Sequence, residues 1–131
     1  MENKSNEATI LRPEGDRILN APLIKMDLNK FIDQLKQEIT WVESDHNSIT
    51  VFKSDYMTIV LIGMHKNAEL KKHAAKGNIN IQLLEGQISF TTEQQTVSLE
   101  KGQMIALQAG ILHSVLAIKE SFFLLNMMLS N

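Results

Sequence analysis

The chain has 131 residues, which is the length of a single domain with one hydrophobic core. Hydrophobic residues make up 44% of it and charged residues 21%, a composition that excludes an intrinsically disordered protein. The formal net charge of −2 provides no positive field for nucleic acid or an anionic membrane, and the lack of cysteine excludes disulfides, thiol catalysis and zinc–thiolate sites.

The N-terminal segment, residues 1–16, is expected to be a flexible arm, because it is rich in Asn, Glu and Ser and has Pro13 and Gly15 near its end. It has no apolar stretch of the kind found in secretory signals. The apolar runs elsewhere are much shorter than the roughly 20 residues of a membrane helix. We therefore expect a cytoplasmic protein with one domain over residues 17–131.

An amphipathic helix is predicted over residues 28–39. Asp27 is a suitable N-cap, and the segment before it, residues 17–25, is expected to be extended with Pro22 at an edge or turn. Trp41 follows the helix and is expected to anchor it to the rest of the domain. The apolar residues at helical spacing are Leu28, Phe31, Ile32, Leu35 and Ile39.

After Trp41 the hydrophobic pattern changes to a period of two, which is typical of β-strands. Short turn signals such as Glu85-Gly86 and Lys101-Gly102 separate the runs. Short strands at close, regular spacing predict an antiparallel sandwich or barrel. The predicted strands are 48–53, 56–64, 78–85, 87–92, 96–100, 104–107, 113–119 and 121–128.

The last predicted strand, residues 121–128, is apolar on both faces. One face is expected to join the core. The other face is expected either to pack under the helix or to form an exposed patch, and such a patch is typical of a homodimer interface. The two outcomes are compatible, so we expect a homodimer.

Two histidines and several glycines follow one another at regular places along these strands. His73 precedes one strand, Gly86 and Gly102 close two others, and the element Gln108-Ala109-Gly110-Ile111-Leu112-His113 leads into the next. In order and spacing, residues 56–128 resemble the cupin family, whose small barrels carry a histidine–glutamate–glycine motif and a second motif ending in Pro-x-Gly-x-x-His. The resemblance implies an all-β fold, a double-stranded β-helix or jelly-roll barrel, here with one N-terminal amphipathic helix.

The resemblance also implies a metal site, but this chain has only two of its four ligands. Metal-binding members hold a divalent ion with three histidines and a glutamate, and the matching residues here are Lys71, His73, Ile79 and His113. A divalent ion needs three or more N or O ligands, and a lysine cation repels it. We therefore expect no cofactor. If a divalent metal binds, its ligands are His73 and His113, with His65 as a further candidate that needs an inward-folded loop.

Strand alternation predicts which residues face the interior. The lumen is expected to have apolar walls with a few polar groups, as small-molecule pockets do, while an interior packed shut is the alternative. Four lysines, at 66, 71, 72 and 76, form a positive band opposed only by Glu69, which favours either an anion-attracting mouth or a solvated loop. His46 lies in a polar turn and is expected to be exposed.

The leading hypothesis is a cupin-like domain that binds a small organic, possibly anionic, molecule in the barrel lumen without a complete metal site. One alternative is an isomerase, epimerase or metal-dependent oxygenase with His73 or His113 as the catalytic residue. Another is a dimeric scaffold with a vestigial pocket. Neither nucleic acid nor a membrane is expected as a partner. The predicted ligand-binding residues are Lys71, His73, Ile79, Ile81, Leu83, His113 and Val115.

Overall fold

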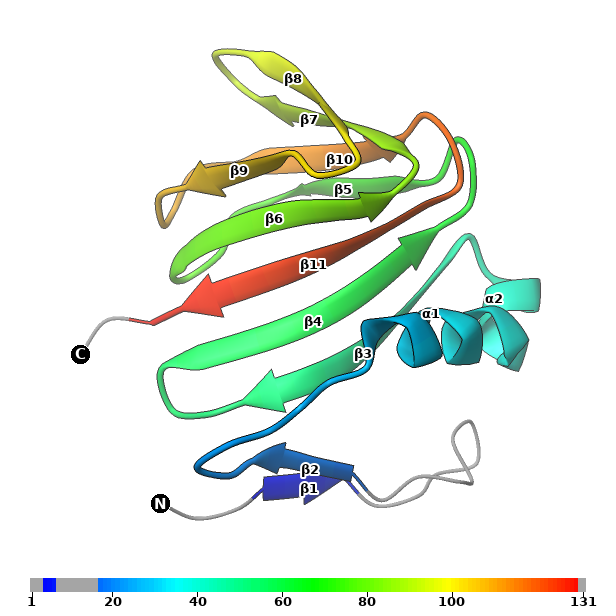
Figure 1. Ribbon diagram of the computed structural model, residues 1–131. Coiled ribbons are helices and arrows are strands. Elements are labelled where there is room, and N and C mark those ends of the chain that lie inside the picture. Colours follow the sequence, from blue (N-terminus) through cyan, green and yellow to red (C-terminus); the bar gives the residue numbers. More distant parts are fainter. Residues whose placement is uncertain (1–3, 7–16, 130–131) are drawn as a thin grey trace.

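The computed structural model describes residues 4–6 and 17–129, and most of its regular structure is β-strand (Figure 1). The larger sheet contains β3 (His46–Lys53), β4 (Met57–Met64), β6 (Asn78–Glu85), β9 (Met104–Leu107) and β11 (Ser121–Met128). The smaller sheet contains β5 (Glu69–His73), β7 (Gln87–Thr92), β8 (Thr96–Glu100) and β10 (His113–Ala117). A separate pair is formed by β1 (Lys4–Asn6) and β2 (Arg17–Asn20).

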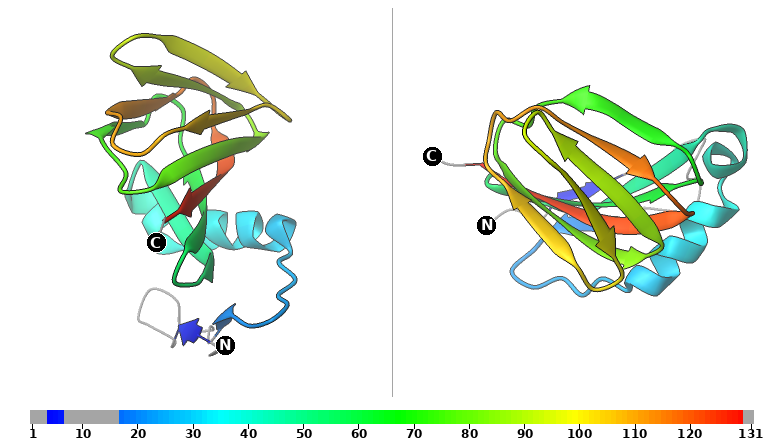
Figure 2. Two further views of the ribbon diagram at one scale, coloured as in Figure 1. Left: turned by 90° about the vertical axis from the view of Figure 1, so that its left-hand side faces the viewer. Right: turned by 90° about the horizontal axis from the view of Figure 1, so that it is seen from above.

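All strand pairs are antiparallel, in the order β3-β4-β11-β6-β9 in the larger sheet and β5-β10-β7-β8 in the smaller. This crossed order is that of a jelly roll and confirms the predicted fold class. Within the described residues no strand pairing joins the two sheets, so this jelly roll is a sandwich whose sheets do not close into a continuous barrel. Figure 2 shows the smaller sheet stacked over the larger one.

The predicted strands agree closely with the observed ones, and five of them have the predicted bounds: 78–85, 87–92, 96–100, 104–107 and 121–128. The sequence pattern misses β5, because Leu70 is its only apolar residue and no alternation marks it. It also misses β1, which lies inside the expected arm; the remainder of that arm lies outside the described residues. The division into an arm and one domain stays a prediction.

The predicted helix is present but divided into α1 (Leu28–Gln37) and α2 (Ile39–Glu43). Asp27 caps α1 as expected, because its carboxylate accepts a hydrogen bond from the backbone amide of Lys30 at 3.2 Å. Glu38 interrupts the helix with an extended backbone conformation, and its carboxylate accepts a hydrogen bond from Asn47 at 3.0 Å. None of the described helices is long and apolar enough to cross a membrane.

The protein has two apolar cores, one on each side of the larger sheet. The inner core lies between the two sheets and includes Ile81, Leu83 and Phe123. The outer core lies between the larger sheet and the helices, where Trp41 and Phe122 pack together as the predicted anchor. Figures 1 and 2 show α1 and α2 against β3 and β4, far from the β7–β8 hairpin.

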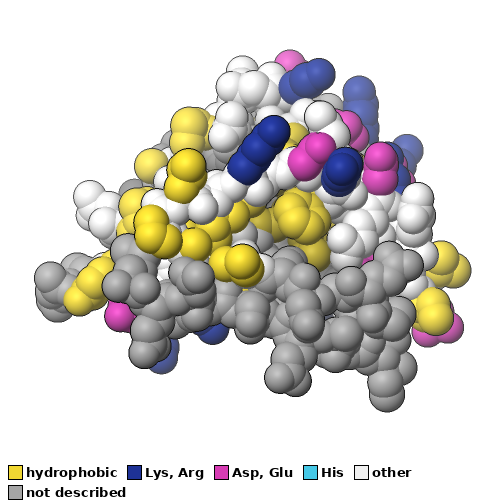
Figure 3. Space-filling model, turned by 60° about the horizontal axis from the view of Figure 1, so that its bottom comes forward, with side chains coloured by type: hydrophobic (Ala, Val, Ile, Leu, Met, Phe, Trp, Pro, Cys, Tyr) yellow, Lys and Arg dark blue, Asp and Glu magenta, His cyan; other side chains and the backbone are white. Residues whose placement is uncertain are grey.

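The second apolar face of β11 is covered by the helices at its first residues, where Phe122 is 1% exposed, whereas Met128 at its end is 40% exposed. Burial under the helix, one of the two expected outcomes, is therefore present. Figure 3 shows hydrophobic side chains gathered on the underside of the molecule. The homodimer stays a prediction.

The two glycines of the sequence motifs give a test of this fold. Gly86 and Gly102 both have positive φ, +92° and +85°, but a Cβ atom at Gly86 would overlap the Glu120 carbonyl and Ser121, while one at Gly102 would meet open space. We expect Gly102→Ala to lower the free energy of unfolding by roughly 1 kcal/mol through backbone strain alone, and Gly86→Ala by about 3 kcal/mol. Urea denaturation measures both, and equal losses would contradict the β6–β11 packing.

Candidate functional site

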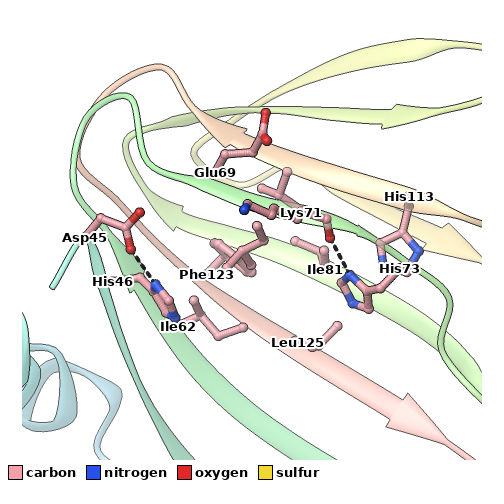
Figure 4. A pocket seen from close by; sticks show the side chains of 12 residues that line it. Asp45, His46, Ile62, Glu69, Lys71, His73, Ile81, His113, Phe123 and Leu125 are labelled. Atoms are coloured by element: carbon pink, nitrogen blue, oxygen red, sulfur yellow. Dashed lines mark hydrogen bonds and ion pairs between the residues drawn. The ribbon is translucent and has the colours of Figure 1, made fainter.

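A cavity of about 510 Å³ lies between the sheets, under the edge strand β5 (Figure 4). Its volume falls within the ordinary range for small-molecule sites. Its apolar lining residues are Ile62, Leu70, Ile81, Val115, Phe123 and Leu125. Its polar lining residues are Asp45, His46, Glu69, Lys71, His73 and His113. The space predicted inside the fold is therefore open, and the interior is not packed shut.

An irregularity in β5 brings His73 to the cavity. In the pairing with β10, His73 lies opposite His113 and Leu70 lies opposite Val115. Two residues of β5, but only one of β10, separate these pairs, so β5 carries one extra residue and forms a β-bulge. Regular alternation would place Leu70 and His73 on opposite faces, whereas the bulge lets both line the cavity.

His73 and His113 are oriented by the same kind of hydrogen bond. Nδ1 of His73 lies 2.9 Å from the carbonyl oxygen of Lys71, and Nδ1 of His113 lies 2.9 Å from that of Ile111. A carbonyl oxygen only accepts hydrogen bonds, so each Nδ1 carries the hydrogen and donates it. In the neutral rings Nε2 then carries the lone pair, and neither Nε2 has a hydrogen-bond partner among residues 18–129.

The two imidazoles form one polar group at this end of the cavity. Their ring centroids are 4.4 Å apart, and Phe90 stacks on the other side of His113 at 5.3 Å with 16° between the planes. His113 is 3% exposed and is fixed by these contacts, while His73 is exposed and forms the accessible side of the pair. Figure 4 shows both rings directed into the same space.

A second polar group lies at the opposite end. His46 is the first residue of β3, and its Nδ1 lies 2.7 Å from a carboxylate oxygen of Asp45. This hydrogen bond lowers the pKa of Asp45, against a smaller opposing effect of desolvation. Both side chains are partly exposed, His46 by 44% and Asp45 by 58%, so they form the rim of the cavity and not its floor.

The placement of His46 corrects the expectation that it lies in a turn, because it is the first residue of β3 and lines the cavity, while its side chain is partly exposed. The signal was present in the sequence, because alternation counted back from Ile49 places Asn47 toward the helices and His46 on the opposite, inner face. The side chain of Asn47 donates hydrogen bonds to the carbonyl of Leu35 at 3.1 Å and to Glu38 at 3.0 Å. These bonds hold the start of β3 in that orientation.

Some of the other predicted site residues line the cavity and some do not. Ile81 and Val115 line the cavity with the histidines, whereas Ile79 and Leu83 are buried elsewhere on the inward face of β6 and do not line it. Of the four lysines in the basic band only Lys71 lines the cavity, and Lys72 instead pairs with Glu93 at 3.6 Å.

His65, the further metal candidate, also lies outside the cavity. Its ring stacks on Trp41 with the centroids 3.7 Å apart, and its Nε2 donates to the carbonyl oxygen of that residue at 2.7 Å. Metal binding by His65 would require the loop to fold inward, and the structure does not show this.

The donor set of the cavity does not fit a tightly bound divalent ion. Lys71 and Ile79 occupy the positions that the family fills with a histidine and the glutamate, and Ile79 is 3% exposed. In the described part of the chain, no three His, Cys, Asp or Glu side chains are grouped so that they could hold a metal ion. Two imidazoles supply fewer ligands than the three that protein metal sites normally use. A metal-free cavity stays a prediction.

Comparisons with known proteins define the class. The sequence matches no protein-family model and no curated protein. Among similar solved structures, a cupin superfamily protein from Desulfitobacterium hafniense DCB-2 has a TM-score of 0.64 at 17% identity, over 67% of this chain and 81% of that one. A conserved protein of unknown function from Streptococcus pyogenes has a TM-score of 0.63 at 27% identity, over 68% of this chain and 79% of its own.

A third similar structure is salicylate 1,2-dioxygenase from Pseudoaminobacter salicylatoxidans, solved as adducts with gentisate. It has a TM-score of 0.65 at 17% identity, and the match covers 76% of this chain but 31% of the dioxygenase. Together with the strand order, these likenesses identify a jelly-roll sandwich of the cupin kind. The protein has the cupin fold.

The hydrogen bond between Asp45 and His46 can be tested by titration. We expect His46→Phe to raise the pKa of Asp45 toward its ordinary value, because the hydrogen bond from His46 is the main cause of its lowering. Since the folded-state pKa is lowered, the stabilisation is complete at neutral pH and is lost as the pH falls through the lowered value. NMR of the Asp45 carboxyl carbon measures the change, with His73→Phe as a control that leaves it unaltered. An unchanged Asp45 titration in His46→Phe would contradict the contact.

Proposed function

We propose that this cupin-like domain binds a small organic anion in the cavity between its sheets, without a complete metal site. The observation that carries the proposal is the position of Lys71, which lines the cavity next to the oriented His73–His113 pair and gives this space a cation. Both rings border an apolar floor that includes Phe123, and Lys71 supplies a cation beside it. Apolar walls with a few oriented polar groups are the usual features of a small-molecule site.

Lys71 favours an anion over a cation in its own part of the cavity, although the two carboxylates of Asp45 and Glu69 also belong to the lining. Glu69 is the only acidic side chain of β5 and lines the cavity with Lys71, and Figure 4 shows it directed upward from the strand while the Lys71 amine lies over the cavity. An ammonium group beside an apolar floor attracts a carboxylate and repels a metal ion. One of the similar structures holds gentisate, itself a small carboxylate, which supports the choice of acids as first ligands.

A proton-transfer enzyme of the isomerase or epimerase type is the second candidate. The Nε2 atom of His113 carries a lone pair in a rigid, buried ring, which is the state that a general base requires. Transfer of solvent deuterium to a bound acid would distinguish this enzyme from a binding protein.

The third hypothesis, a dimeric scaffold with a vestigial pocket, would be favoured if no acid, sugar or amino acid altered the thermal stability of the protein.

The role of Lys71 can be measured directly. We expect a thermal-shift screen of small carboxylates to identify ligands, and Lys71→Ala to weaken their binding by roughly 3- to 10-fold at low salt, the effect of a partly exposed charge contact. Lys72→Ala is the matched control, because Lys72 pairs with Glu93 outside the cavity and its loss leaves affinity unchanged. Equal losses in both variants, or no binding by the wild type, would contradict the proposal.

The metal-free state gives a separate prediction. Protein purified without chelators is expected to contain far less than one equivalent of Fe, Mn, Ni or Zn by elemental analysis, because no three possible ligands are grouped together in the described residues and the His73–His113 pair has a lysine beside it. Lys71→His adds a third imidazole at the matching position and is expected to raise Zn²⁺ affinity measurably in calorimetry. A stoichiometric metal in the wild-type protein would show that the missing ligands are supplied in another way.

A further inference from the structure

The cavity has a second polar end that the metal-site comparison does not account for. Figure 4 shows Asp45 and His46 at one end and His73 and His113 at the other, with Lys71 between them. The two ends come from different sheets, since His46 belongs to β3 of the larger sheet and the histidine pair to β5 and β10 of the smaller. A molecule that fills the cavity therefore meets polar groups on both sides.

The protonation of His46 follows from its partner. Asp45 is a carboxylate at neutral pH and only accepts hydrogen bonds, so the 2.7 Å contact requires that Nδ1 of His46 carry the hydrogen. In the neutral ring Nε2 then carries the lone pair, and it has no hydrogen-bond partner among residues 18–129. Figure 4 shows the ring beside Ile62, on the cavity side of the strand.

In their neutral form, all three histidines that line the cavity therefore have the same tautomer. Nδ1 of His46 is bound by a carboxylate, and Nδ1 of His73 and of His113 by backbone carbonyls, which leaves three Nε2 acceptors at its edges. A ligand that has only a carboxylate offers no hydrogen to these atoms. A hydroxyl group does, because its hydrogen is donated to a nitrogen lone pair.

We propose that Asp45 and His46 form a hydroxyl-binding subsite, so that the ligand of this cavity is an organic acid that also carries a hydroxyl group. The acid group contacts Lys71, and the hydroxyl donates its hydrogen to Nε2 of His46. Asp45 is a positioning residue that fixes the imidazole in the accepting form. This inference rests on the proposed binding of small anions and adds the second functional group of the ligand.

Matched aromatic acids test the subsite by calorimetry on the full chain. Benzoate carries only the acid group, and salicylate and its meta and para isomers add one hydroxyl at each position around a rigid ring. We expect at least one isomer to bind the wild-type protein about 3- to 10-fold more tightly than benzoate, the usual effect of one hydrogen bond. His46→Ala is expected to abolish that difference, so that no isomer binds this variant more tightly than benzoate does.

Two further variants separate the subsite from a general disturbance. His46→Gln retains an acceptor oxygen and is expected to keep part of the hydroxyl preference. Asp45→Asn is expected to weaken the preference, since an amide also donates to Nδ1 and admits the opposite tautomer, which long-range ¹H–¹⁵N spectra report directly. Lys72→Ala removes a side chain that does not line the cavity, and is expected to alter neither benzoate affinity nor the preference.

The outcomes distinguish the two proposals. If benzoate binds and Lys71→Ala weakens it, but no isomer exceeds benzoate or the preference survives in His46→Ala, the hydroxyl subsite is wrong and anion binding stands. If neither benzoate nor any isomer binds the wild-type protein, the proposed anion site is wrong for this class of acid, and the subsite is wrong with it.

Discussion

Both cores of this protein depend on one strand, β11, whose consecutive phenylalanines point to opposite faces of the larger sheet. Phe122 packs against the helices and Phe123 packs between the sheets, and they are 1% and 0% exposed. The strand pairs with β4 on one side and β6 on the other, so neither core can shift without the other. Leu125 continues from the inner core into the cavity lining, which places the site on the most constrained strand of the fold.

The site itself depends on one extra residue in β5. The bulge between Leu70 and His73 lets an apolar residue and an imidazole share a face, and the carbonyl of Lys71 within the bulge orients that imidazole. This arrangement is local, because the hydrogen bond joins the His73 ring to the carbonyl two residues earlier in the chain and needs no distant partner. His113 uses the same arrangement with Ile111, so the two rings are oriented before any ligand is present.

The period of two is sufficient to predict a strand where one face is apolar and the other polar. In β6, for example, Ile79, Ile81 and Leu83 alternate with exposed or partly buried residues. It was insufficient for β5, whose bulge breaks the alternation and whose side chains are mostly polar. The family resemblance does not indicate the Asp45–His46 end of the cavity, because it marks only metal-ligand positions. A polar dipeptide before a strand also has the composition of a turn. The spacing of strands does not show whether two sheets join at their edges, so the sequence predicts a sandwich or barrel and the structure decides between them.

The histidine geometry also explains how a cupin-like cavity changes its preference without being rebuilt. Because backbone carbonyls hold both Nδ1 hydrogens, the orientation of the two rings does not depend on which side chains occupy the neighbouring positions. A carboxylate and a third imidazole at those positions would add the remaining ligands of a cation site. Lysine and isoleucine instead supply a positive charge and an apolar side chain. Two side chains thus decide the charge next to the imidazoles, while the bulge and the strand pairing position the rings in either case.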